Sequence, residues 1–430
     1  MTVITPPRGL ETEKDRDLER VADLEALIEE ARQRARRRRR RIGAFALLLI
    51  LVGAATFVVF GRSASGSSSG SRANPRSPAS AFDSFPVDIS GFVSAFAFDP
   101  RAPDTVYVAT SGDGLAHGGR VYKTTDAGKH WRLTTSSDWT RVDALAIDPQ
   151  HPDTLYAGTG TAVFKTVNGG QSWRGANRGL FSGPRQIGPA PSDRRRYGWV
   201  TSLAVDPADG DSVYAGTPTG IRKSTDGGRS WRTVLRPGKY IVGSTFVITP
   251  THPHLVYVAA SIVGPAGCSV NAPVHCGGSN WLYVSTNGGK TWRMTRLPLT
   301  AAASGITLAA DRLRPTILYL AQIRHAFTST NAGASWRSIV AGLPKHDISS
   351  LVVDPRRSGT AYLVEGLHSD ILKTTDGGHT WAHVGLLGFP ILAFALDPAR
   401  PTTMYAAIDA DHRNRILRSN DGGHTWATVP

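Results

Sequence analysis

The sequence predicts an all-β protein: a seven-bladed β-propeller of four-stranded antiparallel blades, preceded by an N-terminal helix and one transmembrane helix. Three observations lead to this prediction. One pattern of short strands and turns recurs seven times after residue 92, and propeller repeats are typically about 40–50 residues long. An uncharged run of 19 residues, 42–60, precedes the repeats. A stretch rich in Gly, Ser and Pro separates the two.

Residues 1–41 are predicted to form a charged helix. From Leu10 to Arg41 the chain lacks Pro and Gly and is rich in Glu, Leu, Ala and Arg, which favour helices. Apolar residues recur at helical spacing within it, at Val21, Leu24, Ile28 and Ala31. This stripe covers only about two heptads, so we expect a solvated helix beside the membrane rather than a coiled coil.

Residues 42–60 are predicted to cross a membrane once. At ~1.5 Å per residue, this run can span a hydrocarbon core of ~30 Å. Six consecutive arginines, Arg36 to Arg41, precede it, so the positive-inside rule places the N-terminus in the cytoplasm and the repeats outside the cell membrane. A cleaved signal peptide is the alternative, but its charged and apolar segments would both be too long. Residues 61–84 then form a flexible stalk, because they cannot bury enough apolar surface to fold.

The chain is basic, with a formal net charge of +15. Scattered positive charge usually keeps a protein soluble, and the arginine run is explained by its position against the membrane. We therefore expect no nucleic-acid partner. Only two cysteines occur, Cys268 and Cys276, and they lack zinc-ligand spacing. We expect no metal and no cofactor, and we predict a disulfide between the two cysteines because they share one exported segment.

Residues 85–430 contain the seven repeats. Each opens with an apolar strand that ends in Asp-Pro or a near variant, such as VSAFAFDP at 93–100. A second, tyrosine-centred strand follows, such as TVYVAT at 105–110. A third strand runs into the motif [ST]-x-[DN]-x-G-x-x-W, whose tryptophan starts the fourth. The Asp or Asn positions of the seven motifs are Asp126, Asn168, Asp226, Asn287, Asn331, Asp376 and Asp421.

This motif suits a tight turn. A hydroxyl and an Asp or Asn oxygen can bond backbone N–H groups, glycine can take a positive φ, and the tryptophan ring can pack under the loop. On these residues the sequence resembles the Asp-box, or BNR, propeller superfamily, which includes sialidases, sortilin-type ectodomains, xyloglucanases and the photosystem II assembly-factor family. The resemblance covers about 92–430 and implies the fold. It implies no single function, because one fold hosts unrelated activities.

Each blade is expected to be one contiguous stretch of chain. The ring would then close by side-chain packing of blade 7 on blade 1, although a strand from residues 85–90 at this seam is also compatible with the sequence. Loops after the first and third strands should share one face, which we call the Asp-box face. Loops after the second and fourth strands should lie on the other, which we call the irregular face because two long insertions, 175–198 and 261–280, fall there.

Where the other loops of a repeat are short, binding sites tend to lie on the long loops. The irregular face also receives the three tryptophans that lie outside the motifs. The candidate ligand-binding residues are Trp139, Arg194, Arg195, Arg196, Tyr197, Trp199, Tyr240 and Trp281. Aromatic and arginine side chains together would suit a glycan, a peptide or an anionic polymer. The alternative is that these aromatics merely pack against the insertions.

The function expected first is a non-catalytic binding or assembly module for an extracytoplasmic protein or glycan. The alternative is a glycoside hydrolase, sialidase-like or xyloglucanase-like, which needs two carboxylates about 5–10 Å apart. Candidate acids on the irregular face are Asp113, Asp138, Asp347, Glu365, Asp370, Asp409 and Asp411. The chain lacks the Arg-Ile-Pro motif of sialidases, which have six blades, and xyloglucanases pair two propellers where one is seen here. We therefore expect no enzyme. A purely structural scaffold is a third possibility.

Overall fold

The computed structural model describes residues 89, 91–111, 118–135, 139, 141–181, 199–238, 240–263, 278–299, 305–339, 348–365, 370–386, 389–410 and 413–429. All of them fall in one compact unit, Phe82–Pro430. The expected helix at 1–41, the span 42–60, the stalk 61–84 and the two cysteines lie outside the described residues. Within the described ranges, no helix is long and apolar enough to cross a membrane.

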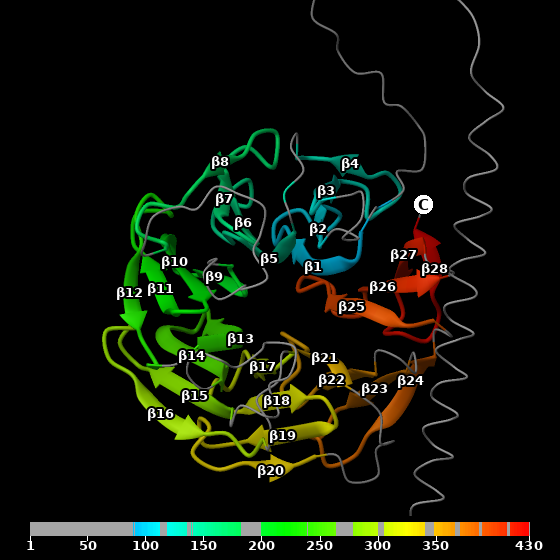
Figure 1. Cartoon of the computed structure of the whole chain (residues 1–430). Helices are drawn as coiled ribbons and strands as arrows, with labels where there is room; N and C mark the ends of the chain where they lie inside the picture. The colour runs from blue at the N-terminus through cyan, green and yellow to red at the C-terminus, as the bar shows by residue number, and fades with distance from the viewer. Residues whose placement is uncertain are drawn as a thin grey trace, which may run out of the picture. The chain divides into compact units, whose positions relative to one another are not determined.

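Seven four-stranded antiparallel sheets are arranged in a ring as the blades of a propeller (Figure 1). Blade 1 consists of β1 (Val93–Phe98), β2 (Val106–Thr110), β3 (Val121–Thr124) and β4 (Arg132–Leu133). Blade 2 consists of β5 (Val142–Ile147), β6 (Leu155–Thr159), β7 (Val163–Thr166) and β8 (Arg174–Gly175). Blade 3 consists of β9 (Ser202–Asp206), β10 (Asp209–Thr217), β11 (Gly220–Ser224) and β12 (Arg232–Leu235). Blade 4 consists of β13 (Tyr240–Thr249), β14 (His252–Val263), β15 (Ser279–Ser285) and β16 (Arg293–Arg296).

The last three blades repeat this order. Blade 5 consists of β17 (Thr307–Ala310), β18 (Leu318–Gln322), β19 (His325–Ser329) and β20 (Arg337–Ser338). Blade 6 consists of β21 (Ile348–Val353), β22 (Ala361–Glu365), β23 (Asp370–Thr374) and β24 (Ala382–Leu386). Blade 7 consists of β25 (Ile391–Leu396), β26 (Met404–Ala410), β27 (Arg413–Ser419) and β28 (Ala427–Val429). The fold and blade number are as the sequence predicts, and every blade is contiguous in the chain.

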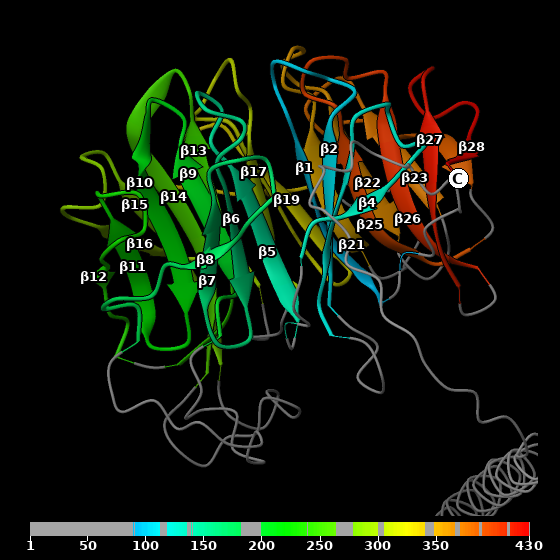
Figure 2. The same cartoon turned by 90° about the horizontal axis from the view of Figure 1, so that it is seen from above.

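The core lies between neighbouring blades. The first strand of each blade is nearest the centre of the ring and the fourth is at its rim (Figure 1), while Figure 2 shows the blades side by side. Because alternate side chains of a strand point to opposite faces, the second strands are buried on both sides. Each contributes one tyrosine that is almost fully buried, namely Tyr107, Tyr156, Tyr214, Tyr257, Tyr319, Tyr362 and Tyr405.

In the part of the chain that the structure describes, side-chain contacts between blade 7 and blade 1 close the ring. Blade 7 residues Tyr405 and Ile416 share a hydrophobic cluster with Phe98 and Trp131 of blade 1. Polar contacts cross the same seam: Arg400 Nη2 lies 2.8 Å from Asp104 Oδ1, the Tyr405 hydroxyl donates to Ala127 O (3.4 Å), and Asn414 Nδ2 donates to Gly91 O (2.5 Å). Ile89 is described and is in no strand, so the described residues add no strand at this seam.

The inner strands carry a repeated irregularity near the irregular face. The register of the first strand against the second shifts at Val93/Ala95, at Val142/Ala144, at Ile348/Ser350 and at Ile391/Ala393. A β-bulge of this kind re-aims the side chain of the extra residue. The extra residue in blade 2 is Asp143.

Candidate functional site

The Asp boxes are structural turns. In blade 3, Ser224 Oγ donates to Asp226 Oδ1 (2.8 Å) and accepts from the Gly228 N–H (2.8 Å). Ser230 donates its N–H to Asp226 Oδ1 (2.8 Å) and its hydroxyl to Oδ2 (2.6 Å). These bonds, the Ser230 hydroxyl first, lower the pKa of Asp226 to about 2. Gly228 has a φ of 83°, as the turn requires.

Asparagine makes the same turn without a charge. In blade 2, Asn168 Oδ1 accepts from the Thr166 hydroxyl (2.8 Å) and from the Ser172 N–H (2.9 Å). Its Nδ2 donates to Ser172 Oγ (2.9 Å), so this hydroxyl accepts where Ser230 donates. Asn287 and Asn331 repeat the arrangement with Thr291 and Ser335. A carboxylate is thus not essential to the turn.

Lysines that precede several boxes join neighbouring blades, which our sequence analysis missed. Lys223 Nζ donates to Gly288 O (2.9 Å) in the box of the next blade and lies 4.8 Å from the centre of the Tyr214 ring. Tyr214 donates its hydroxyl to the same carbonyl (2.9 Å). Lys165 makes the equivalent bond to Gly227 O (3.0 Å). The signal is a lysine directly before the box hydroxyl, which recurs at Lys123, Lys165, Lys223 and Lys373.

Of the predicted ligand-binding aromatics, Trp139 is a core residue. Its ring stacks on Phe164 with centroids 4.4 Å apart and meets Trp173 edge-on at 5.4 Å. Only 7% of Trp139 is exposed, so this residue packs blade 1 on blade 2 and presents no open ring face. The packing alternative therefore holds for Trp139.

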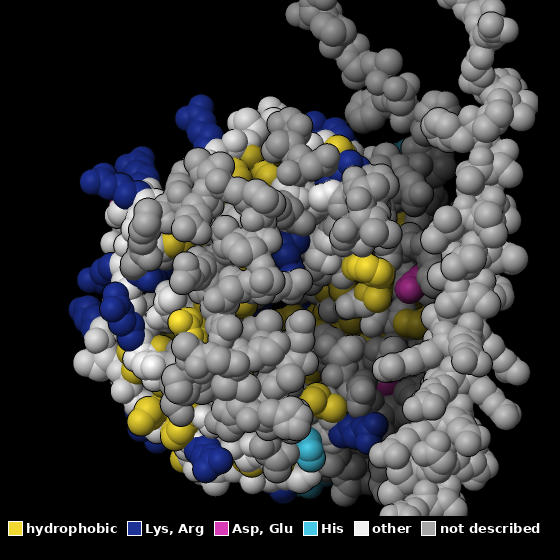
Figure 3. Space-filling model, in the orientation of Figure 1, with side chains coloured by type: hydrophobic (Ala, Val, Ile, Leu, Met, Phe, Trp, Pro, Cys, Tyr) yellow, Lys and Arg dark blue, Asp and Glu magenta, His cyan; other side chains and the backbone are white. Residues whose placement is uncertain are grey.

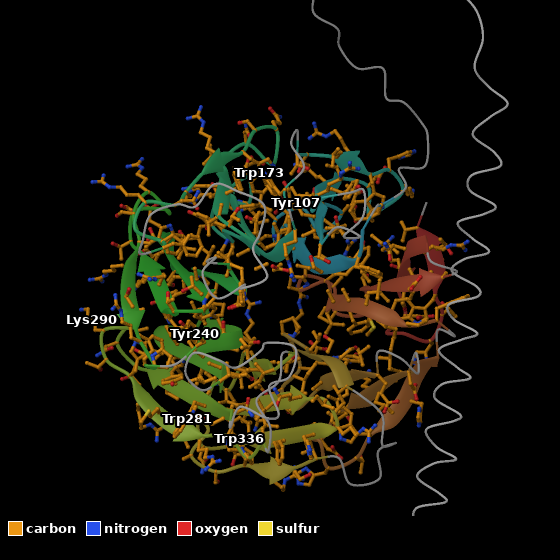
Figure 4. The ribbon with its side chains drawn as sticks, in the orientation of Figure 1. Tyr107, Trp173, Tyr240, Trp281, Lys290 and Trp336 are labelled. Atoms are coloured by element: carbon orange, nitrogen blue, oxygen red, sulfur yellow. The ribbon has the colours of Figure 1, made fainter. Side chains whose placement is uncertain are left out.

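The remaining predicted residues divide into two groups. Tyr240 and Trp281 both belong to blade 4 (Figure 4) and are half-buried, as is Trp199. Trp281 donates its Nε1–H to Ser279 Oγ (2.8 Å). Arg194, Arg195, Arg196 and Tyr197 lie outside the described residues. A ligand-binding role for this set stays a prediction.

Two exposed phenylalanines on the irregular face were not predicted. Phe92 is 47% exposed and Phe389 is 39% exposed. They stand just before the inner strands β1 and β25, which belong to neighbouring blades. Nearby, the Asp409 N–H donates to Pro390 O (3.0 Å), while Asp409 Oδ1 has no donor among the described residues. The irregular face of blades 7 and 1 thus carries two exposed aromatic rings, and Asp409 Oδ1 is a buried oxygen in blade 7.

The candidate acids are also divided. Asp113, Asp138, Asp347 and Asp411 lie outside the described residues. Glu365 and Asp370 are directly opposite each other on β22 and β23. Both are buried, and Asp370 Oδ2 lies 2.6 Å from His383 Nδ1.

Asp143 is a further carboxylate that sequence reasoning missed. It lies on the inner strand of blade 2, paired with Arg141 (Nε to Oδ1, 2.6 Å), and burial raises its pKa. Blades 3 and 4 also carry polar residues on or beside their inner strands. Ser244 Oγ is 2.9 Å from Thr201 Oγ1 and 2.7 Å from Ser202 Oγ. The signal was a charged residue in an otherwise apolar first strand. Across the described chain, no group of three metal-ligating side chains could hold a metal ion.

Comparison with known proteins identifies the repeat family. The BNR/Asp-box repeat family matches residues 283–294, and the boxes described above recur in every blade, so the chain is a BNR/Asp-box repeat propeller. Among curated proteins it resembles xyloglucanases. One is the probable oligoxyloglucan-reducing end-specific xyloglucanase of Neosartorya fischeri, 31% identical over 170 residues, which are 37% of this chain and 20% of that protein.

A second relative is the xyloglucanase of Hypocrea jecorina, 24% identical over 376 residues, which cover 74% of this chain and 40% of that protein. This chain thus spans less than half the length of either relative. Among solved structures, an ancestral GH74 enzyme superposes with a TM-score of 0.57 at 17% identity, over 79% of this chain and 46% of that one. At that identity, the structural likeness shows the fold alone.

Proposed function

We propose that this propeller recognises a polysaccharide on its irregular face. The observation that carries the proposal is the similarity to two xyloglucanases, one of them matched over 74% of this chain. The chain covers only 40% of that relative, so its activity does not transfer as a whole. What transfers to the proposal is the class of ligand, a glycan, which was among the ligands expected from the sequence.

The seam between blades 7 and 1 supplies suitable chemistry. Sugar rings present apolar C–H faces that stack on aromatic rings, and their hydroxyls donate to carboxylates. Phe92 and Phe389 offer exposed rings, whereas Asp409 Oδ1 is a buried oxygen and is not part of the exposed surface. The two exposed phenylalanine rings form our candidate glycan subsite.

Hydrolysis of the bound glycan is the second candidate function. The observation in its favour is that Glu365 and Asp370 face each other across β22 and β23. Opposed residues on neighbouring strands have Cβ atoms ~4.5–5.5 Å apart on the same face of the sheet, so these two side chains form a carboxyl pair of the kind that glycoside hydrolases use. Both side chains are buried, so a substrate would have to reach them through the irregular face.

The test measures binding and turnover with the same protein. The full chain is titrated with xyloglucan oligosaccharides, and the release of new reducing ends from polymeric xyloglucan is followed. Phe92→Ala and Phe389→Ala should each weaken binding about 2- to 10-fold, since an aromatic contact contributes roughly 0.5–1.5 kcal/mol. Leu313→Ala is the matched control, because Leu313 is 57% exposed and lies in a loop of the Asp-box face.

The outcomes separate the candidates. Binding without release of reducing ends supports recognition alone. Release that is lost in Glu365→Gln and Asp370→Asn, while binding survives, supports the glycoside hydrolase. A third outcome is that the protein binds none of xyloglucan, cellulose and mixed-linkage glucan but captures a purified envelope protein. This outcome would support the binding or assembly role expected from the sequence.

A further inference from the structure

The rim of the ring carries an arginine at the same position in five consecutive blades. The residue after the box tryptophan begins the outer strand. In blades 1 to 5 it is exposed and is Arg132, Arg174, Arg232, Arg293 or Arg337. The same position holds Ala382 in blade 6 and Ala427 in blade 7. Figure 3 shows Lys and Arg side chains at the edge of the ring beside β12. We call these five residues the rim arginines.

Four of the five rim arginines have no side-chain partner among the described residues. The side chains of Arg132, Arg174, Arg232 and Arg293 make no hydrogen bond or ion pair within the described residues. Only Arg337 is engaged, through Nη2 to Gly377 O (3.4 Å). Unlike the box lysines, which join the blades, these guanidinium groups hold nothing together. Their recurrence is not explained by the stability of the ring.

A cationic groove interrupts the rim between blades 2 and 3. It has a volume of about 420 Å³ and is lined by Lys165, Arg174 and Arg229 but by no carboxylate. Asn168 and Ser172 add polar side chains to its wall. Lys165 also interacts with Asp211 and Arg229 with Asp226, so Arg174 is the lining cation that is most available to an anionic group.

We propose that the rim arginines and this groove bind a linear acidic polysaccharide. Guanidinium groups bind carboxylates through two parallel hydrogen bonds, and one arginine per blade offers repeated contacts to an extended chain. The exposed apolar neighbours on the outer strands are Leu133 and Met294, which are aliphatic. Binding of single-stranded nucleic acid relies on stacking of bases on aromatic rings, which these strands do not present. The surface therefore favours an acidic glycan over nucleic acid.

The rim surface is independent of the proposed function. The rim arginines follow the Asp boxes, whereas Phe92, Phe389 and Asp409 lie on the irregular face. Loss of one binding activity should leave the other intact. A neutral glycan has no charge for the rim, so the two ligands also differ in chemistry.

The experiment uses the full chain and polygalacturonate, a linear polymer of uronic acid, at low and at moderate ionic strength. The test variant is Arg174→Glu, Arg232→Glu and Arg293→Glu together. The matched control is Arg101→Glu, Arg356→Glu and Arg357→Glu, which changes the net charge equally at exposed positions in loops that follow inner strands. Thermal unfolding of both variants establishes that they are folded.

The wild type should bind polygalacturonate, and added salt should weaken the binding because exposed charges are screened. The rim variant should lose about tenfold or more in affinity, while the control changes by less than about twofold, since scattered surface charges contribute little. Three results would each overturn the proposal: no binding by the wild type, an equal loss in the control, or equally tight binding of a single-stranded oligonucleotide with the same dependence on the rim. Unchanged xyloglucan binding by the rim variant is expected in every case.

Discussion

At the scale of single residues, the polar residues and the tryptophan of the Asp box have different structural roles. The hydroxyl and the Asp or Asn oxygen satisfy backbone N–H groups of the turn, while the tryptophan fills space between blades. Trp231 is 6% exposed, and its Nε1–H donates to Ala176 O (2.8 Å). The carboxylate of Asp226 is near the surface and its bonds are all local. The two residues should therefore differ in what their loss costs.

Replacing Trp231 with Ala should cost about 3–5 kcal/mol of unfolding free energy, because it leaves a cavity where a large ring was buried. Asp226→Ala should cost about 1–2 kcal/mol, through the lost turn hydrogen bonds. Asp226→Asn should be nearly neutral, because Asn168 already makes the same turn in blade 2. Urea denaturation measures all three, and equal tolerance of the first two would show that the boxes are not structural hairpins.

Acid should weaken the Asp-containing boxes before the Asn-containing ones. The pKa of Asp226 is lowered to about 2 from an ordinary 3.8, and the pKa values of Asp126, Asp376 and Asp421 are also lowered by hydrogen bonds to the carboxylate. A lowered pKa in the folded state stabilises the fold above the ordinary pKa, and this contribution is lost as pH falls through the folded value. Stability should therefore decline between about pH 4 and pH 2.

The control for this pH dependence is a variant in which all four aspartates are replaced by Asn, whose stability should be flatter over that window. Burial raises the pKa of Asp143 and Asp206, and such groups have the opposite sign: protonation stabilises the fold as pH falls through their raised values. Their effect is complete below the ordinary pKa. An undiminished decline in the Asn variant would assign the acid sensitivity elsewhere.

At the scale of elements, the unit that stabilises the ring is the contact between one blade and the next. A buried tyrosine on the second strand and a lysine on the third reach the box of the following blade, as Tyr214 and Lys223 do at Gly288 O. Blades 4 and 5 have Val284 and Thr328 at the lysine position. The contact is thus used repeatedly but is not required in every blade.

Tyr214→Phe and Lys223→Met should each destabilise the protein by less than about 1 kcal/mol, because the other donor still satisfies the carbonyl of Gly288. The double variant should cost more than the sum, since a carbonyl that has lost both protein donors carries the penalty of an unmet hydrogen bond. A double-mutant cycle of unfolding free energies gives the coupling. Strict additivity would mean that the two donors act separately.

At the scale of the whole molecule, the seam between blades 7 and 1 is built like the other interfaces. It has a buried tyrosine, a hydrophobic cluster and a hydrogen bond to an Asp box. Among the described strands, none from one end of the chain completes the blade of the other. Side-chain packing, together with polar contacts such as that between Arg400 and Asp104, therefore holds the ring closed.

Tyr405→Ala at the seam should cost about as much as Tyr156→Ala between blades 2 and 3, about 3–5 kcal/mol each, because both rings are fully buried. The midpoint and slope of urea unfolding measure each cost. If Tyr405→Ala instead produces a separate early transition in which blade 7 is lost, the seam is a weak point of the ring.

The orientation of the chain in a membrane remains a proposal, which rests on the arginines before residues 42–60. A reporter that is active only outside the cytoplasm, fused after Pro430, should be active. The same reporter fused after residue 41 of a truncated chain is the control and should be silent. An inactive reporter after Pro430, with the propeller spared by added protease, would reverse the topology.

The sequence by itself determined the class of fold, the number of blades and the position of every Asp box, because these depend on local patterns that recur in each repeat. It also sufficed for the prediction of contiguous blades. The tertiary structure decided which side chains face solvent. Trp139 was expected on a binding surface and is core, because Phe164 and Trp173 cover it. Phe92 and Phe389 become candidates only once neighbouring blades are in place. The exposure of a side chain depends on which residues of the next blade pack against it. The sequence of a single repeat does not show these contacts between blades.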